Sequence, residues 1–332
     1  MSTSPQTLHR KRVVILDRGY GSYKYEEDVF EAAGFALEVY AGDPQDRDAK
    51  LAFAQGAQGL LVRGTIVDGP FLDAVPGVKA IVRYGVGYDN VNVAAATVRG
   101  IRVANVSGYA NHSVSDHALA LMFACARALP LGMQTFKSTY GHAPRLDMME
   151  FRYATLGIVG LGQIGGTLAR KARTLFGRIL ASDPYVSDAR FDTLGVAKTD
   201  LDNLLAESHV ISLHCNLTPE TTHLIDRRAF GLMRHRPVLV NTARGPVVDE
   251  DALLDALTGD QIHSAGIDVY SEEPPWPRLD ALLSHPRAIA TGHYAFYSET
   301  AMVDLQTRAA DNLAALLRGE TPPDCLNPEG TL

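Results

Sequence analysis

Three charged residues, Arg244, Glu273 and His293, have the side-chain types that proton transfer beside a bound anion requires. Each comes within a few residues of a short apolar run, so each is expected at a strand end or in the loop after it. An arginine there can form a two-pronged pair with a carboxylate, which a lysine cannot match. A histidine can hand a proton to a developing alkoxide, and a nearby carboxylate fixes its tautomer and stabilises the imidazolium. The three types predict an anion-binding arginine beside an acid–base pair.

Each of these residues also has an ordinary structural interpretation. Arg244 alone could form a surface ion pair, Glu273 could be a solvated loop acid, and His293 could be a satisfied core histidine. For a single histidine the core interpretation is the more common one, because most histidines in a chain are not catalytic. A cofactor motif earlier in the chain would reverse that preference, and the sequence contains one.

The cofactor motif is a glycine-rich turn between a strand and a helix. The apolar run Thr155–Val159 leads directly into Gly160-x-Gly162-x-x-Gly165, and a helical pattern follows. In such a motif Gly160 makes the tight turn, Gly162 lets the backbone approach a pyrophosphate, and Gly165 lets helix and strand pack closely. The free N–H groups and the positive dipole end of the helix then face the phosphates.

The sequence after the motif supports a dinucleotide site over an ordinary strand–helix turn. A second strand, Arg178–Ser182, ends at Asp183, which lies 183 − 165 = 18 residues past Gly165. An acid about 20 residues past the motif reaches the adenine ribose hydroxyls, favours NAD and repels the 2′-phosphate of NADP. A nicotinamide beside an arginine, a histidine and a carboxylate is what a 2-keto/2-hydroxy acid redox reaction requires.

The surrounding elements predict an α/β fold with two doubly wound parallel-sheet domains, because strands alternate with helical patterns throughout. The chain before the glycine motif forms a complete α/β unit by itself, so a Rossmann NAD-binding domain, residues 116–298, is predicted to be inserted into a substrate domain, residues 1–115 plus 299–332. Ligands are expected in the cleft between the domains. Besides the two strands at the motif, the predicted strands are Arg12–Asp17, Leu37–Tyr40, Gly59–Arg63, Val78–Val82, Ile101–Asn105, Val210–His214, Val238–Asn241, Ser264–Asp268 and Ala288–Ala290.

Two long helical patterns, His112–Ala128 and Ser298–Arg318, are predicted to connect the domains, the first with a serine cap at Ser113 or Ser115. The stretch Pro130–Met149 has no clear periodicity. It is predicted to be either a loop or an arm that clasps a second subunit, because its apolar residues would need cover. The second alternative predicts a homodimer.

Composition excludes several classes of protein. The 332 residues suffice for two domains, and a net charge of −7 gives no reason to expect binding to nucleic acid or to an anionic membrane. Three widely spaced cysteines predict neither a disulfide framework nor a metal site. No apolar run reaches about 18 residues, and the N-terminus lacks an apolar signal core, so the cytoplasm is the default expectation.

Several motifs together resemble the D-isomer-specific 2-hydroxyacid dehydrogenase family. They are Gly157–Gly166, Asn241–Glu250, Asp268–Pro274 and the segment around His293, while Arg83–Val91 is similar to the family's substrate-anion loop. The resemblance extends from Arg12 to Leu317. Within the family the chain most resembles the branch of the C-terminal-binding protein corepressors, on His214-Cys215, Asp183–Tyr185 and His293–Glu299.

The resemblance implies roles for individual residues in a flavodoxin-like substrate domain and a Rossmann domain. Arg244 would hold the substrate carboxylate and keto oxygen, His293 would be the acid/base, and Glu273 would support it. The NAD site would comprise Gly160, Gly162, Gln163, Ile164, Gly165, Asp183, Cys215, Thr221, Thr242, Ala243, Asp268 as partner of the carboxamide, and Val86. The substrate would also meet Arg83, Tyr84, Gly85 and Phe296, and the amides of the Gly85–Gly87 turn could form an anion nest.

The sequence departs from the family pattern at Gly292, Tyr84 and Phe296, and also at Asp116, where an acid one carbon longer is usual. Gly292 replaces the usual proline before the histidine, which loosens the approach to the ring. Tyr84 is bulkier than the residue expected there, and Phe296 stands where the corepressor branch often has tryptophan; both favour an apolar or aromatic substrate pocket.

The competing interpretation is an NAD(H)-sensing, corepressor-like dimer with little turnover. Formate oxidation is disfavoured, because releasing CO₂ gives Glu273 no proton to relay.

Overall fold

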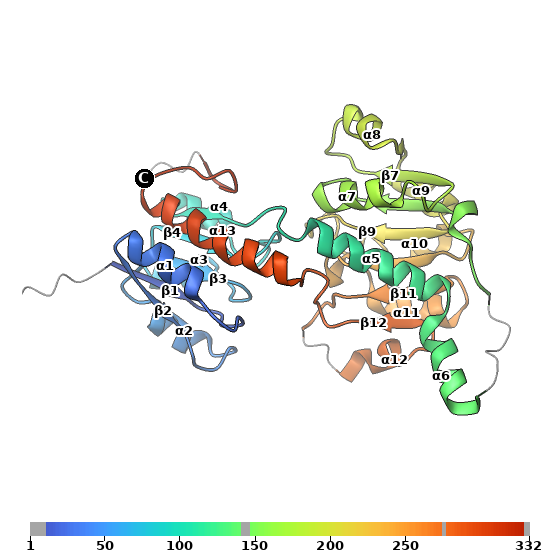
Figure 1. The fold of residues 1–332 in the computed structure, drawn as a ribbon, viewed down its shortest axis with the longest axis horizontal. Helices are drawn as coiled ribbons and strands as arrows, with labels where there is room; N and C mark the ends of the chain where they lie inside the picture. The colour runs from blue at the N-terminus through green and yellow to red at the C-terminus, as the bar shows by residue number, and fades with distance from the viewer. Residues whose placement is uncertain (1–10, 141–146, 274–276, 329–332) are drawn as a thin grey trace, which may run out of the picture. The chain divides into compact units, whose positions relative to one another are not determined.

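The computed structural model describes residues 11–140, 147–273 and 277–328. The chain divides into two compact units, each with its own parallel sheet (Figure 1). The first unit contains the chain up to Tyr109 and from Ser298 onward, and the second contains Ala110–Tyr297. In the order of the sequence, the second unit is therefore inserted into the first.

The first unit is a five-stranded sheet in the order β2-β1-β3-β4-β5, which is the flavodoxin-like order. Alternate residues of each strand face opposite sides, as the period of a strand requires. Val13 and Ile15 pack with α1 and α13, whereas Val14 and Leu16 pack with α2, α3 and α4. The strands are β1 Lys11–Ile15, β2 Phe35–Val39, β3 Ala57–Val62, β4 Ala80–Arg83 and β5 Arg102–Ala104; the helices are α1 Lys24–Ala32, α2 Arg47–Ala54, α3 Gly69–Ala74, α4 Val93–Val98 and α13 Glu299–Leu317.

The second unit is a seven-stranded parallel sheet in the order β12-β11-β10-β9-β6-β7-β8. Its strands follow the Rossmann order: successive strands are added on one side of β6 as far as β8, and then on its other side, beginning with β9. The strands are β6 Thr155–Val159, β7 Arg178–Ser182, β8 Ala197–Lys198, β9 Val210–Leu213, β10 Val238–Asn241, β11 Ser264–Ile267 and β12 Ala288–Ala290. The α/β class with two doubly wound sheets is confirmed, and among the strands of the described residues only the two-residue β8 was not predicted.

Helices cover both faces of this second sheet. Helices α5 and α7 pack on one face, and α9, α10 and α11 pack on the other. The bounds are α5 Asn111–Ala126, α6 Leu129–Thr139, α7 Gln163–Ala172, α8 Asp188–Leu194, α9 Leu201–Glu207, α10 Arg227–Leu232, α11 Glu250–Thr258 and α12 Asp280–Leu283, with short 3-10 turns at Phe151–Tyr153, Gly245–Val247 and Pro277–Leu279. No helix of the described ranges is by itself long and apolar enough to cross a membrane; α5 and α6 pass that test only as a pair bent by 53°.

Two local predictions about the helices were wrong. The first residues of α5 have no side-chain cap; the Ser115 hydroxyl donates instead to the Asn111 carbonyl one turn back. The segment predicted to be irregular contains α6, which begins just before Pro130. A proline is tolerated in the first turn because its missing N–H would have no partner there. Part of the same segment, residues 141–146, lies outside the described residues.

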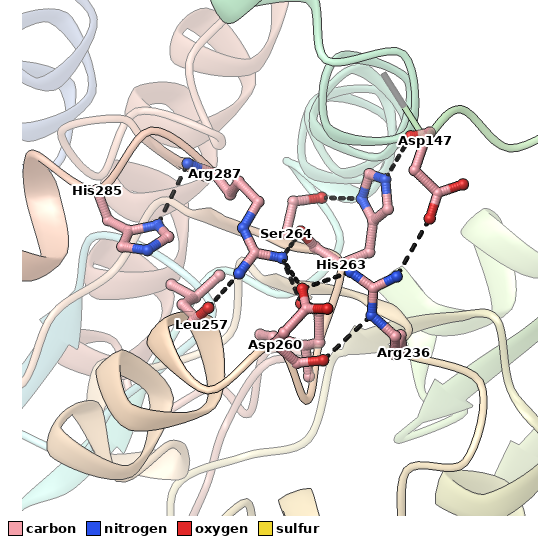
Figure 2. A network of polar contacts seen from close by, with 9 residues as sticks. Asp147, Arg236, Leu257, Asp260, His263, Ser264, His285 and Arg287 are labelled. Atoms are coloured by element: carbon pink, nitrogen blue, oxygen red, sulfur yellow. Dashed lines mark hydrogen bonds and ion pairs between the residues drawn. The ribbon is translucent and has the colours of Figure 1, made fainter. Parts of the chain in front are cut away.

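A polar network lies at the amino-terminal ends of β10, β11 and β12 in the second sheet (Figure 2). The Asp260 carboxylate accepts hydrogen bonds from Arg236 at 2.5 Å and from Arg287 at 2.8 Å. His263 donates to the Asp147 carbonyl at 2.7 Å, and Arg236 forms an ion pair with the Asp147 carboxylate at 3.2 Å. The network bonds Asp147 to the amino-terminal ends of these strands, which are opposite to their carboxyl ends.

Candidate active site

In the glycine turn after β6, packing within the protein requires glycine at two of the three positions. Gly160 has a φ of 90°, and a Cβ there would lie 2.6 Å from the Cys215 nitrogen after β9. A Cβ at Gly165 would collide with the Gly160 carbonyl oxygen. At Gly162, by contrast, a Cβ would meet no atom within 4 Å. The open side of Gly162 is therefore available to a bound group, as the pyrophosphate interpretation requires.

Asp183 is held beside the same turn. Its carboxylate accepts hydrogen bonds from the Leu161 amide at 2.7 Å and from the Tyr185 amide at 2.9 Å. The Thr242 hydroxyl oxygen, directly after β10, is buried and has no hydrogen-bond partner within the described ranges. A buried hydroxyl without a partner is uncommon in native proteins. The open turn, the acid and the unsatisfied hydroxyl all fit a dinucleotide along the carboxyl ends of these strands.

Sequence inspection missed Arg190 on α8. Its guanidinium donates to the Gly162 carbonyl at 2.8 Å and to the Leu161 carbonyl at 3.3 Å. These bonds fix the peptide groups of the glycine turn from one side. No local pattern marks this arginine, because its partners lie 28 and 29 residues earlier.

Of the other residues predicted to bind the cofactor, Gln163 and Ile164 are the first residues of α7, while Cys215 and Thr221 follow β9 and Ala243 follows β10. The Gln163 side chain accepts a hydrogen bond from Asn111, the Thr221 hydroxyl donates to the Asn216 carbonyl, and the Ala243 amide donates to the Asn241 side chain. Burial, helped by the charge of Asp183, raises the pKa of the Cys215 thiol to about 11. This cysteine is therefore a neutral, weakly reactive thiol at neutral pH.

Arg244 is positioned by the residue that follows it. A Cβ at Gly245 would overlap the Tyr270 carbonyl, so glycine is needed for the chain after β10 to pass directly against the chain after β11. The Asn241 side chain donates to the Arg244 carbonyl at 2.9 Å and fixes the turn. This close passage brings Arg244 to the loop that contains Glu273.

Glu273 and His293 form a hydrogen-bonded pair. The Glu273 Oε2 and His293 Nδ1 atoms are 2.5 Å apart, and about a third of each side chain is exposed, 36% and 35%. The other Glu273 oxygen accepts from the Tyr270 amide at 3.1 Å. Burial alone would raise the pKa of Glu273, but the hydrogen bond with His293 and the charges of His293 and Arg244 lower it below its ordinary value. The three predicted residues are thus brought together within one unit.

Two further predicted residues lie on the His293 side of the site. The Phe296 ring stands edge-on to the imidazole, with 6.1 Å between centroids. Asp268 is 1% exposed, and its carboxylate accepts from the Thr291 hydroxyl and from the Tyr294 and Ala295 amides. The carboxylate of Asp268 therefore already organises the loop around His293. The implied contact of Asp268 with the carboxamide of NAD stays a prediction.

In the first unit, the predicted anion turn follows β4. Gly85 has a φ of 135°, and the Arg83 guanidinium folds over it and donates to the Tyr84 carbonyl at 2.8 Å. The Asn105 side chain donates to the Val86 carbonyl at 2.6 Å. These bonds occupy carbonyl groups of the turn, which leaves its amides as the groups suited to an anion.

The structure corrects the expectation that the Tyr84 ring shapes a substrate pocket. Tyr84 is 2% exposed, and its hydroxyl donates to the buried Glu26 carboxylate at 2.8 Å inside the core of the first unit. Side chains of successive residues in an extended chain point to opposite sides. The side chain of Tyr84, directly after β4, points into the interior of the first unit. Only its backbone could meet a ligand.

A family model for the NAD-binding domain of the D-isomer specific 2-hydroxyacid dehydrogenases matches residues 119–295. The chain belongs to this family. The match covers the glycine turn, Asp183, Arg244, Glu273 and His293, and it shows that the second unit is the NAD-binding domain. Among the described residues no group of three or more histidine, cysteine, aspartate or glutamate side chains could hold a metal ion.

The relatives are named for different hydroxy or keto acids. The chain is 39% identical to the D-3-phosphoglycerate dehydrogenase of Mycobacterium tuberculosis over 90% of its own length and 56% of the relative, so it spans little more than half of that protein. It is 33% identical to the D-lactate dehydrogenase of Escherichia coli, covering 91% of this chain and 95% of the relative. The crystal structure of a glyoxylate reductase from Paecilomyes thermophila superposes with a TM-score of 0.85 at 26% identity, covering 97% and 100% of the chains. The nearer resemblance to the corepressor branch stays a prediction.

We expect Glu273 to remain ionised over the whole neutral range. Because its pKa is lowered in the folded protein, the charged form is present above the ordinary value of 4.5 and is lost only as the pH falls through a still lower value. A ¹³C NMR titration of the glutamate carboxyl groups, with the Glu273 signal assigned by its absence in Glu273→Gln, measures this directly. A midpoint above 4.5 would contradict the prediction.

We expect Gly292→Ala to stabilise the protein by about 0.4–1 kcal/mol. Gly292 does not have a positive φ, and a Cβ there would meet no atom within 4 Å, so alanine should restrict the unfolded chain without strain. Urea denaturation of both proteins checks this. Gly160→Ala is the matched control, because its positive φ and its contact with Cys215 should make alanine destabilising there.

Proposed function

We propose that this protein is an NAD-dependent D-2-hydroxyacid dehydrogenase that interconverts a 2-keto acid and a D-2-hydroxy acid. The observation that carries the proposal is the 2.5 Å hydrogen bond between Glu273 and His293, formed close enough to Arg244 for its charge to act on Glu273. An acid–base pair beside an arginine serves a substrate that has both an ionised carboxylate and a carbonyl oxygen that gains a proton.

Each residue has a separate task in this proposal. The Arg244 guanidinium binds the substrate carboxylate and keto oxygen, because its planar fork matches two oxygens. Glu273 accepts from Nδ1 of His293, so the proton to be transferred sits on Nε2. His293 donates that proton to the keto oxygen in reduction and accepts it back in oxidation. NAD, when bound as NADH, supplies the hydride that adds to the substrate carbon.

The proposed cofactor preference rests on Asp183. Its carboxylate stands at the end of β7 beside the glycine turn, bound to the Leu161 and Tyr185 amides. A 2′-phosphate placed there would bring a second negative charge next to it. We propose that the protein prefers NADH over NADPH, and that the amides of the Gly85–Gly87 turn can bind an anion.

The test of the proposed reaction is a panel of 2-keto acids with NADH, followed by loss of nicotinamide absorbance. The panel should include pyruvate, glyoxylate, phenylpyruvate and 3-phosphohydroxypyruvate, and a parallel series with NADPH tests the cofactor. Because the Phe296 ring lies beside His293, we expect a keto acid with an apolar side chain to be preferred. A protein that binds NADH but reduces no keto acid would instead favour the NAD(H)-sensing interpretation.

We also propose that the protein is a homodimer joined through α6. Four apolar residues of this helix, Leu129, Met133, Phe136 and Tyr140 at its end, are 48%, 58%, 60% and 85% exposed. Their spacing of four, three and four residues places them along one face of the helix. No residue of α6 is buried in the monomer. A contiguous apolar stripe of this kind is typical of a protein–protein interface.

The dimer is tested by light scattering after size-exclusion chromatography. We expect Phe136→Glu, in the middle of the stripe, to turn dimers into monomers by burying a charge in the interface. Ser138→Glu is the matched control, because it adds the same charge about 180° around the helix from the stripe. A wild-type monomer, or equal masses for the two variants, would exclude α6 as the interface.

A further inference from the structure

The loop that contains His293 has an unfavourable backbone conformation. His293 has a φ of 52°, in the left-handed region that residues with a side chain rarely adopt. The residue before it, Gly292, has no side chain, and a Cβ there would meet no atom within 4 Å, so this residue provides no side-chain packing that would fix the loop. A backbone conformation of this kind persists only where surrounding contacts hold it. The contacts around His293 therefore decide where its imidazole points.

Those contacts converge on Asp268, directly after β11. The Asp268 carbonyl accepts the His293 amide at 2.8 Å. Its carboxylate accepts the next two amides of the loop, Tyr294 at 3.2 Å and Ala295 at 2.9 Å, and the Thr291 hydroxyl at 2.5 Å. One nearly inaccessible side chain thus holds the loop on both sides of His293.

His117, on α5, completes this group from the other side. Its Nε2 atom lies 3.0 Å from the Thr291 hydroxyl oxygen and 3.6 Å from the Asp268 carboxylate. A carboxylate can only accept, so the Thr291 hydroxyl donates its single proton to Asp268 at 2.5 Å and not to the more distant Ile267 carbonyl at 3.5 Å. His117 Nε2 must therefore be the donor to Thr291. The ring is only 17% exposed and also packs edge-on against Tyr294, at 5.2 Å.

The fold brings His117 to this place through one glycine. A Cβ at Gly266 would lie 2.9 Å from the Leu121 Cβ, so glycine in β11 lets α5 approach the strand closely. Leu121 is one helical turn after His117, and Gly266 is two residues before Asp268. Residues two apart in a strand and four apart in a helix share a face. The close approach therefore sets His117 against the end of β11.

We infer that His117 is a positioning residue for the acid/base His293, acting through Thr291 and Asp268. The inference rests on the proposed function. The Nε2–H of His117 orients the Thr291 hydroxyl toward Asp268, and that hydroxyl together with the loop amides balances the buried carboxylate. Asp268 in turn keeps the loop, and with it the imidazole, in place beside Glu273.

Four variants separate the hydrogen bond from the bulk of the ring. His117→Phe keeps an aromatic ring against Tyr294 and removes the donor, whereas His117→Gln retains an N–H donor. Thr291→Val removes the hydroxyl at similar size. His112→Phe is the matched control, because it makes the same substitution at an exposed histidine in the first turn of α5.

In the keto acid assay we expect His117→Phe and Thr291→Val each to lower kcat roughly tenfold, because a displaced acid/base loses alignment. The KM for the keto acid and the Kd for NADH should change by less than about threefold, since Arg244 and the glycine turn are untouched. His117→Gln should recover most of kcat, and the double variant should be little worse than either single one. A merely structural role would lower kcat and NADH-binding capacity together and would not be rescued by glutamine.

Hydrogen exchange keeps the inference testable without turnover. We expect the amides of residues 293–295 to exchange roughly three- to tenfold faster in His117→Phe than in the wild type or in His112→Phe. A wild type that reduces no keto acid overturns the proposed function, while faster exchange would still show that His117 holds the loop. An active wild type, with unchanged kcat and unchanged exchange in His117→Phe, overturns the inference alone.

Discussion

Replacing His293 with alanine should lower kcat for keto acid reduction by roughly 10²- to 10⁴-fold while NADH binding is retained. The imidazole is the titratable group that Glu273 orients at 2.5 Å, and without it no positioned acid protonates the keto oxygen. Stopped-flow measurement of NADH consumption gives the rate, and quenching of NADH fluorescence gives the affinity. An unchanged rate would remove His293 from the mechanism.

Two further variants isolate the chemistry from the backbone. Because His293 has a positive φ, alanine there adds strain, whereas asparagine tolerates this conformation well. His293→Asn should therefore lose activity as severely as alanine while keeping the loop. His285→Ala is the matched control, since His285 precedes the same strand, β12, at its other end. A large loss of activity in His285→Ala would indicate general disruption.

Most of the fold could be predicted from the sequence because the signals are local. The strands β6, β7, β10 and β12 have the predicted bounds, since each is a short apolar run bordered by turn residues. The spacing of the glycine turn is an equally local signal, although only the contact of Gly165 with Gly160 lies within one strand–helix unit and Gly160 itself meets Cys215 after β9. Strand β8 was missed because its two residues, Ala197 and Lys198, are both exposed and form no apolar run.

The candidate site could be predicted only in part, because its supporting contacts are long-range. The types of Arg244, Glu273 and His293 indicated the chemistry, but the contact of Gly245 with the chain after β11 that brings Arg244 to Glu273 has no local signature. Tyr84 shows the opposite error. Its place beside the anion turn suggested a ligand contact, while the partner that holds its ring in the core, Glu26, is 58 residues away.

The same limit explains why His117 escaped notice. It lies in an alanine- and leucine-rich helix, and its polar partner Thr291 is 174 residues later. A histidine in such a helix looks like an ordinary core residue. Only the meeting of α5 with the end of β11 gives it a task, and that meeting depends on tertiary packing that no spacing in the sequence encodes.

Arg244→Ala should lower kcat/KM for the keto acid by roughly 10²- to 10³-fold, because removing one partner of a desolvated charge pair costs about 2–5 kcal/mol. The loss should be divided between KM and kcat, since the guanidinium would hold both the carboxylate, in the ground state, and the oxygen that gains charge in the transition state. Arg244→Lys should remain impaired, because a lysine cannot reproduce the planar fork. NADH affinity should be nearly unchanged.

The control for Arg244 is an arginine with a known, solvated partner. Arg228 pairs with Asp202 on the surface, with 65% and 51% of the two side chains exposed. Exposed pairs of this kind contribute about 0–1 kcal/mol, so Arg228→Ala should leave kcat/KM unchanged. Arg244→Ala could retain full kcat/KM while His293→Ala does not. The proposed role of the Glu273–His293 pair would then stand, and the substrate carboxylate would have to be bound by another group. The Gly85–Gly87 turn would then be the next place to test, because its amides are the other anion-binding groups in the proposal.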